Sequence, residues 1–125
     1  MHDIENRQDI EKLVDAFYKR AIPDQVIGKF FTEVVRLDWE VHIPVLCDFW
    51  ETVLLGNQTY KGNPMVKHIL LSEKEPLLPL HFDRWLELWT HTVHSLFTGK
   101  TADEAITRAN QIAALMKFKV RQAGA

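Results

Sequence analysis

His68 lies in a short segment, residues 63–71, whose pattern favours one or two turns of helix. Pro64 suits the first helical position, because its fixed φ fits the turn and its missing N–H is not needed there. His68 follows Met65 by three residues, so its imidazole lies on nearly the same face as the apolar side chains. Two interpretations stay open from these residues alone. His68 is either a core histidine hydrogen-bonded to a carbonyl or a neutral imidazole that binds a metal or a haem iron.

Tyr18 is a second polar group that the pattern places on an apolar helix face. Apolar residues recur from position 10 to position 18 at the spacing of an amphipathic helix, which predicts a helix over residues 7–21. The apolar stripe ends at Tyr18, so its ring is expected inside the fold, with a hydroxyl that needs a partner. A nearby carbonyl is the plain choice of partner.

His42 stands on the apolar face of a further helix, which is predicted over residues 38–55. Asp38 is the expected N-cap of this helix. Pro44 lies inside its first turns, where it removes one backbone hydrogen bond and is expected to kink or loosen the helix. Cys47 lies beside the apolar face and is expected to be a buried, inert thiol.

Two long helices are predicted in the second half of the chain. Residues 79–98 carry a wide apolar face, and Gly99 is expected to end this helix in a left-handed conformation. Residues 101–121 carry the other pattern, with Thr101 as N-cap and Glu104 completing a capping box. Because no segment shows the alternation of a strand, the sequence predicts an all-α fold.

Other chemistry finds little support in the sequence. His91 and His94 could bind an adventitious metal, although an exposed polar helix face is the plainer interpretation. There is no glycine-rich phosphate loop, no cysteine pair at zinc spacing and no nucleophile motif.

The two ends, residues 1–7 and 121–125, are expected to fray.

Composition narrows the class of protein. The chain has 125 residues, 46% of them hydrophobic, and a net charge of -2 without a basic cluster, which argues against nucleic acid as a partner. No apolar run is long enough to span a membrane, the start does not resemble a signal peptide, and the single cysteine fits a reducing cytoplasm. Four Trp, seven Phe and six His indicate either an aromatic core or a pocket for a large flat ligand.

Six short motifs, taken in their order and spacing, make the chain similar to the group III truncated haemoglobins. They are Phe17-Tyr18, Trp39-Glu40-Val41-His42-Ile43-Pro44, Phe49-Trp50, Tyr60-Lys61-Gly62-Asn63-Pro64, Lys67-His68 and His81-Phe82-Asp83-Arg84-Trp85-Leu86. Each motif alone is weak, but the resemblance covers residues 8–120. It implies one truncated globin domain over residues 1–125, with helices packed two over two around a haem b.

The resemblance also implies roles for single residues. His68 matches the proximal ligand of the haem iron. Three polar residues match the distal side, where they stabilise the bound ligand: Tyr18, His42 and Trp85. Other residues are expected to contact the haem, either on its faces or, for the lysine, at a propionate: Phe31, Leu46, Met116 and Lys67.

The function implied is that of a haem protein that binds dioxygen, nitric oxide and other small ligands. Tight binding suits chemistry on oxygen, nitric oxide or peroxide better than it suits transport. One alternative is a true enzyme, either peroxidase-like or a nitric oxide dioxygenase, which would draw electrons from an external reductase. Another is a non-haem, all-α interaction module whose aromatic face takes a partner and whose histidines are ordinary.

Overall fold

The computed structural model describes residues 1–31, 39–57, 60 and 77–124. Within these ranges the chain forms four long helices and no strand: α1 (Arg7–Ala21), α2 (Trp39–Leu55), α4 (Pro79–Leu96) and α5 (Lys100–Gly124). A short helical turn over residues 28–31 follows α1. The four long helices are confirmed with boundaries that differ from the prediction by at most three residues, and α2 continues through Pro44. The helix predicted over residues 63–71 and the expected N-cap Asp38 lie outside the described residues.

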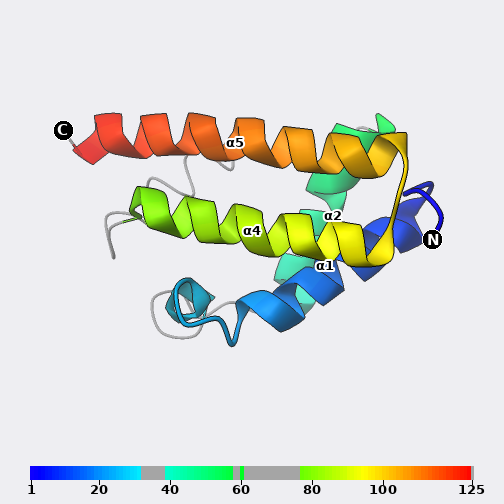
Figure 1. Cartoon of the computed structure of the whole chain (residues 1–125), viewed down its shortest axis with the longest axis horizontal. Coiled ribbons are helices and arrows are strands. Elements are labelled where there is room, and N and C mark those ends of the chain that lie inside the picture. Colours follow the sequence, from blue (N-terminus) through cyan, green and yellow to red (C-terminus); the bar gives the residue numbers. More distant parts are fainter. Residues whose placement is uncertain (32–38, 58–59, 61–76, 125) are drawn as a thin grey trace.

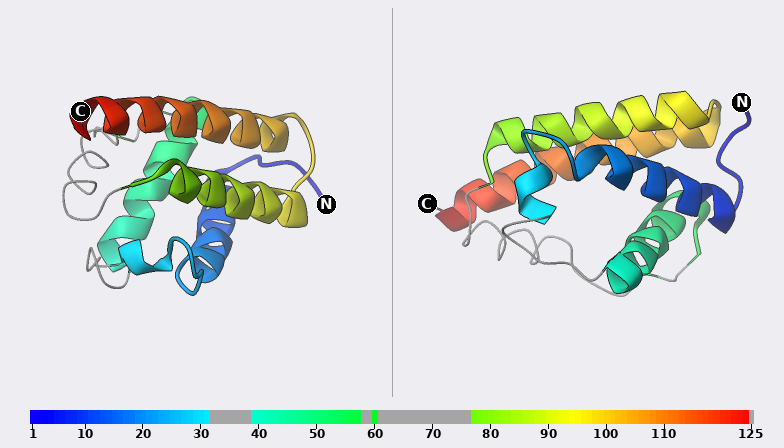
Figure 2. Two further views of the ribbon diagram at one scale, coloured as in Figure 1. Left: turned by 60° about the vertical axis from the view of Figure 1, so that its left-hand side comes forward. Right: turned by 90° about the horizontal axis from the view of Figure 1, so that it is seen from below.

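The four helices form two crossed pairs. Helices α4 and α5 run antiparallel, one above the other, along the long axis of the molecule (Figure 1). Helices α1 and α2 both lie on one side of this pair and run across it, as the two turned views show (Figure 2). The predicted all-α fold with helices packed two over two is therefore confirmed.

The apolar face of α1 supplies the centre of the core. Ile10, Leu13, Val14 and Phe17 are almost completely buried, at the spacing that predicted the helix. Burial of each large apolar side chain contributes about 1.5–3 kcal/mol. Because this face meets both α2 and α4, α1 fixes how the two crossed pairs sit on each other.

A smaller apolar cluster lies apart from the main core. It consists of Phe82 on α4 with Ala113, Met116 and Val120 on α5. Four partly buried side chains pack against both this cluster and the main core: Leu77, Trp85, Leu86 and Ile112. Trp85 thus stands where two apolar regions meet.

The N-terminal segment is held in the fold, contrary to the expectation that residues 1–7 fray. Ile4 is 2% exposed. The carboxylate of Asp3 accepts hydrogen bonds from the backbone N–H groups of Thr101 at 2.9 Å and Ala102 at 2.8 Å. These are donors of the first turn of α5, which have no partner within the helix. The N-terminus accordingly lies beside the yellow connection between α4 and α5 (Figure 1).

The predicted capping box at Thr101 is therefore wrong, because Thr101 already lies inside the helix and Asp3 supplies the cap. Gly99, before the helix, has a φ of 134°, a conformation that favours glycine. A Cβ at this position would also lie 2.6 Å from the Cγ of Asp3. At its other end α5 extends to Gly124, beyond the end expected from the sequence.

Candidate functional site

Tyr18 and His42, predicted on separate helices, lie together in the structure. Tyr18 is in the last turn of α1 and His42 is in the first turns of α2. Their rings meet edge to face, with centroids 5.9 Å apart and planes at 76°. The ring of Phe31, from the turn after α1, also meets Tyr18 edge to face, with centroids 5.4 Å apart. Three of the predicted site residues thus form one aromatic group, held by three different segments.

The Tyr18 hydroxyl keeps its proton near neutral pH. Desolvation by burial raises the pKa of this phenol well above its usual range, and the nearby Cys47 adds to the rise. A neutral phenol can donate its O–H to an acceptor. Burial likewise raises the pKa of the Cys47 thiol to about 11, and the prediction that Cys47 is buried is confirmed.

Trp85 differs from its neighbour Trp89 in how its polar atom is used. The two indoles on α4 are nearly parallel, with planes at 12° and centroids 6.1 Å apart. The indole N–H of Trp89 donates to the carbonyl of Ala105 at 3.2 Å. No residue that the structure describes accepts a hydrogen bond from the N–H of Trp85. Of this pair, Trp85 therefore has the donor that could serve a ligand.

Phe17 connects Trp85 to the Tyr18 group. Its ring contacts Tyr18 at 5.0 Å and Trp85 at 6.2 Å, in both cases edge to face. Leu46, one turn after His42, is half-buried against the main core. Met116 is buried in the smaller cluster, against which Trp85 packs. His68 and Lys67 lie outside the described residues.

An ion pair that the sequence did not suggest ties two of these segments together. The Asp24 carboxylate accepts hydrogen bonds from the backbone N–H groups of Val26 and Ile27 at 3.0 and 3.1 Å. The Arg84 guanidinium, on α4, lies 2.8 Å and 2.9 Å from the same carboxylate. Because Arg84 precedes Trp85 and Asp24 precedes the turn that holds Phe31, this pair fixes the turn against α4.

The pKa of Asp24 reflects these contacts. Burial alone would raise the pKa, but the bond from Arg84, the two backbone N–H groups and the charge of Arg84 together lower it. Asp24 therefore stays ionised, and the pair is intact, throughout the neutral range.

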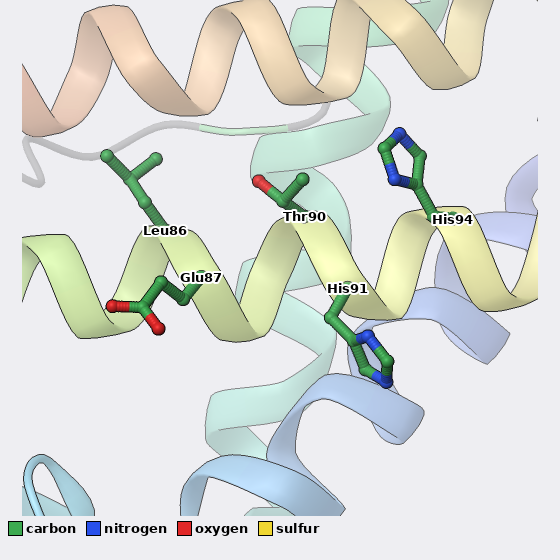
Figure 3. Close-up of a pocket in the computed structure, with 5 residues that line it drawn as sticks. All are labelled: Leu86, Glu87, Thr90, His91 and His94. Carbon is green, nitrogen blue, oxygen red and sulfur yellow. The ribbon is translucent and has the colours of Figure 1, made fainter.

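The two histidines in the second half of α4 lie on its exposed surface. His91 and His94 are exposed and border a shallow depression together with Leu86, Glu87 and Thr90. Figure 3 shows the two imidazoles pointing to different sides of the helix. Among the described residues no cluster of three or more metal-binding side chains occurs. The plainer interpretation, an exposed polar face, is confirmed.

His81 has a structural role that the sequence did not reveal. Its ring is buried at the start of α4, where Nδ1 accepts the backbone N–H of Leu78 at 2.9 Å. The ring of Phe30 contacts it at 4.9 Å.

None of the helices in the described ranges is long and apolar enough to cross a membrane.

Comparison with known proteins gives one relative in sequence and one in structure. No protein-family model matches the chain. The group 3 truncated hemoglobin ctb of Campylobacter jejuni is 28% identical over 111 residues, which cover 86% of this chain and 85% of that protein. The crystal structure of group III truncated hemoglobin from Campylobacter jejuni superposes with a TM-score of 0.83 at 26% identity, covering 96% of this chain and 95% of the other. Together they confirm the resemblance predicted from the sequence: this chain has the truncated-globin fold and is similar to the group III truncated haemoglobins along most of its length.

Proposed function

We propose that this chain is a haem protein that binds dioxygen and other diatomic ligands beside Tyr18, His42 and Trp85. The observation that carries the proposal is the likeness, over nearly the whole chain, to a crystal structure of a truncated haemoglobin. The chemistry of the described residues supports it. Two neutral donors, an O–H and an N–H, stand among apolar side chains, which is the setting that a small, weakly polar ligand requires.

The proposed cofactor is a haem b. Phe31 and Leu46 are partly buried apolar side chains that could contact a flat macrocycle, and Met116 lies in the smaller apolar cluster, against which Trp85 packs. His68 is the proposed iron ligand, because it matches the proximal histidine of the family, and Lys67 is the proposed partner of a propionate. When bound, the haem supplies an iron that takes up diatomic ligands and exchanges electrons.

Tyr18 and Trp85 are proposed to hold the ligand. A ligand oxygen that carries partial negative charge would be stabilised by fixed hydrogen-bond donors. Each hydrogen bond to such a partly charged group contributes about 1.5–3 kcal/mol, which is about tenfold to a hundredfold in affinity. His42, in ring contact with Tyr18, is proposed to orient the phenol or to donate to the ligand itself.

Slow release of oxygen suits chemistry better than transport. We therefore favour a role in nitric oxide oxidation or in the reduction of peroxide, with electrons from an external reductase. Tyr18 and Trp85 would serve either reaction, since both can donate to an oxygen atom on which charge develops.

The test uses the two tyrosines of this chain. In Tyr18→Phe we expect the oxygen dissociation rate of the ferrous, haem-loaded protein to rise by about tenfold to a hundredfold. Tyr60→Phe removes a hydroxyl from a residue that contacts Phe49 instead, so its rate should match the wild type. An unchanged rate in Tyr18→Phe, measured by stopped flow, would remove Tyr18 from the site.

A further inference from the structure

We infer that Trp85, Trp89 and Trp50 form an electron relay, which carries electrons from the α2 side of the molecule to the distal ligand site. The inference rests on the proposed function, because the relay requires an oxidant that reacts at the haem. It goes beyond ligand binding, since it assigns a redox role to two tryptophans that touch neither Tyr18 nor His42 in the described contacts. The chemical class of the oxidant is hydrogen peroxide.

The three indoles form one continuous stack across two helices. Trp85 and Trp89 on α4 have centroids 6.1 Å apart with planes at 12°. Trp50 on α2 stacks on Trp89 with centroids 4.4 Å apart and planes at 19°. Electrons tunnel between aromatic rings that lie this close, so an electron can pass from one indole to the next in short steps. The stack begins at Trp85, which is a residue of the proposed ligand site.

The surroundings of Trp89 favour transfer over side reactions. Loss of one electron turns an indole into a radical cation whose N–H is more acidic. If that proton left, the neutral radical would stay on this ring and transfer would stop. Here the N–H of Trp89 donates to the carbonyl of Ala105, a weak base that leaves the proton on nitrogen. Trp89 is 1% exposed, so water and oxygen have little access to its oxidised ring. Trp89 can therefore be oxidised and reduced again without chemical loss.

The α2 end of the relay leads toward the surface. Phe49 contacts Trp50 at 5.3 Å and Tyr60 at 5.3 Å. Tyr60 is half-buried, so this aromatic contact approaches the solvent, where a small reductant could donate. A core that needed only apolar volume could be filled by phenylalanine or leucine. The indoles at Trp50 and Trp89 add a ring that is more readily oxidised.

The reaction balances with a one-electron donor such as ascorbate. Reduction of hydrogen peroxide breaks its O–O bond and consumes two electrons and two protons to give two waters. Two ascorbate monoanions each release one electron and one proton, and become two ascorbyl radical anions. Each electron passes from Trp50 to Trp89 to Trp85, while the electron vacancy moves the opposite way. No residue is consumed over a full cycle.

The experiment compares haem-loaded wild type with Trp89→Phe, which interrupts the stack but keeps an apolar ring. Val93→Ala is the control, because it removes a buried side chain from the same core cluster without removing an indole. Haem uptake is first confirmed for each protein by its absorption spectrum. Each is then mixed with hydrogen peroxide in the absence of reductant. Rapid-freeze electron paramagnetic resonance detects tryptophan radicals, and peptide mass spectrometry locates the oxidised residues.

In wild type and Val93→Ala we expect oxidation at Trp50, and we expect ascorbate to suppress it. In Trp89→Phe we expect loss of oxidation at Trp50, with the products moved to Trp85 and Tyr18. Equal oxidation of Trp50 in Trp89→Phe and in the wild type would overturn the relay but leave the proposed function standing. The same holds if the haem-loaded wild type consumes peroxide without oxidation of Trp50. A wild type that takes up no haem would overturn the proposed function and the relay together.

Discussion

Trp85 and Trp89 lie nearly parallel on α4, yet only Trp89 uses its indole N–H within the described protein. The Trp89 N–H donates to the carbonyl of Ala105 on α5, so it joins the two long helices. The Trp85 N–H has no acceptor among the described residues, and Trp85 stands where the two apolar clusters meet. The N–H donor of Trp89 is thus used within the fold, whereas that of Trp85 is placed to serve a ligand.

This difference predicts that replacement by phenylalanine affects mainly stability at Trp89 and mainly oxygen release at Trp85. Trp89→Phe should lower the free energy of unfolding by about 1–3 kcal/mol, because a buried carbonyl loses a partner and the smaller ring leaves a void. Trp85→Phe should change stability less, but should raise the oxygen dissociation rate by about tenfold to a hundredfold. Chemical denaturation and stopped-flow oxygen release measure the two effects. Equal oxygen release from both variants would contradict the assignment of Trp85.

Asp3 is predicted to be a stabilising cap although it lies near the end of the chain. Asp3→Ala should lower the free energy of unfolding by about 1 kcal/mol, the usual cost of losing a helix cap. Asp103→Ala is the matched control, because Asp103 is an exposed acidic residue in the first turn of the same helix. Thermal and chemical unfolding of the two variants should differ. If both lose the same stability, the effect is one of helix charge and not of the cap.

The cap also predicts a dependence on pH. Burial tends to raise the pKa of Asp3, but the backbone N–H groups of Thr101, Ala102 and Ile4 together lower it. A lowered pKa in the folded state means that the stabilisation is complete above the unfolded value, near 3.9, and is lost as the pH falls through the folded value. The stability difference between wild type and Asp3→Ala should therefore shrink in acid. A constant difference would show that the carboxylate charge is not involved.

The Asp24–Arg84 pair is predicted to keep the turn of Phe31 in place. Arg84→Met retains much of the side chain but removes the guanidinium from a carboxylate whose side chain is 5% exposed. We expect a lower unfolding midpoint and a higher pKa for Asp24, since burial then acts with less opposition. Glu87→Gln removes the other partner of Arg84, an exposed carboxylate, and should have little effect. Carboxyl chemical shifts in a pH titration measure the pKa, and an unchanged value would contradict the prediction.

Periodicity predicted the helices because each apolar face is local in sequence. Helix α1 was found where the spacing of Ile10, Leu13, Val14 and Phe17 placed it. Family resemblance added Tyr18 and His42, whose ring contact joins two helices. The helix prediction succeeded because the residues that decide it lie in one helix, whereas the ligand-binding roles of Tyr18 and His42 stay predictions.

The other contacts depend on how distant segments meet, which no local pattern contains. Thr101 looks like an N-cap, but the helix already begins at Lys100, and Asp3, from near the start of the chain, accepts the N–H groups of Thr101 and Ala102. Trp50 and Trp89 look like ordinary core residues, because stacking across α2 and α4 leaves no trace in either helix. In both cases tertiary packing decides between side chains that are equally plausible from sequence.

We propose that His68 holds a haem in this fold. The most direct measurement is the absorption spectrum of the purified protein after loading with haem, in the ferric and then the ferrous state, beside His68→Gly. The exposed His91 provides the control variant, His91→Gly. We expect a strong Soret band in the wild type and in His91→Gly, and a lost or altered band in His68→Gly. A wild type that folds fully and stays colourless would contradict the account and would favour a helical interaction module.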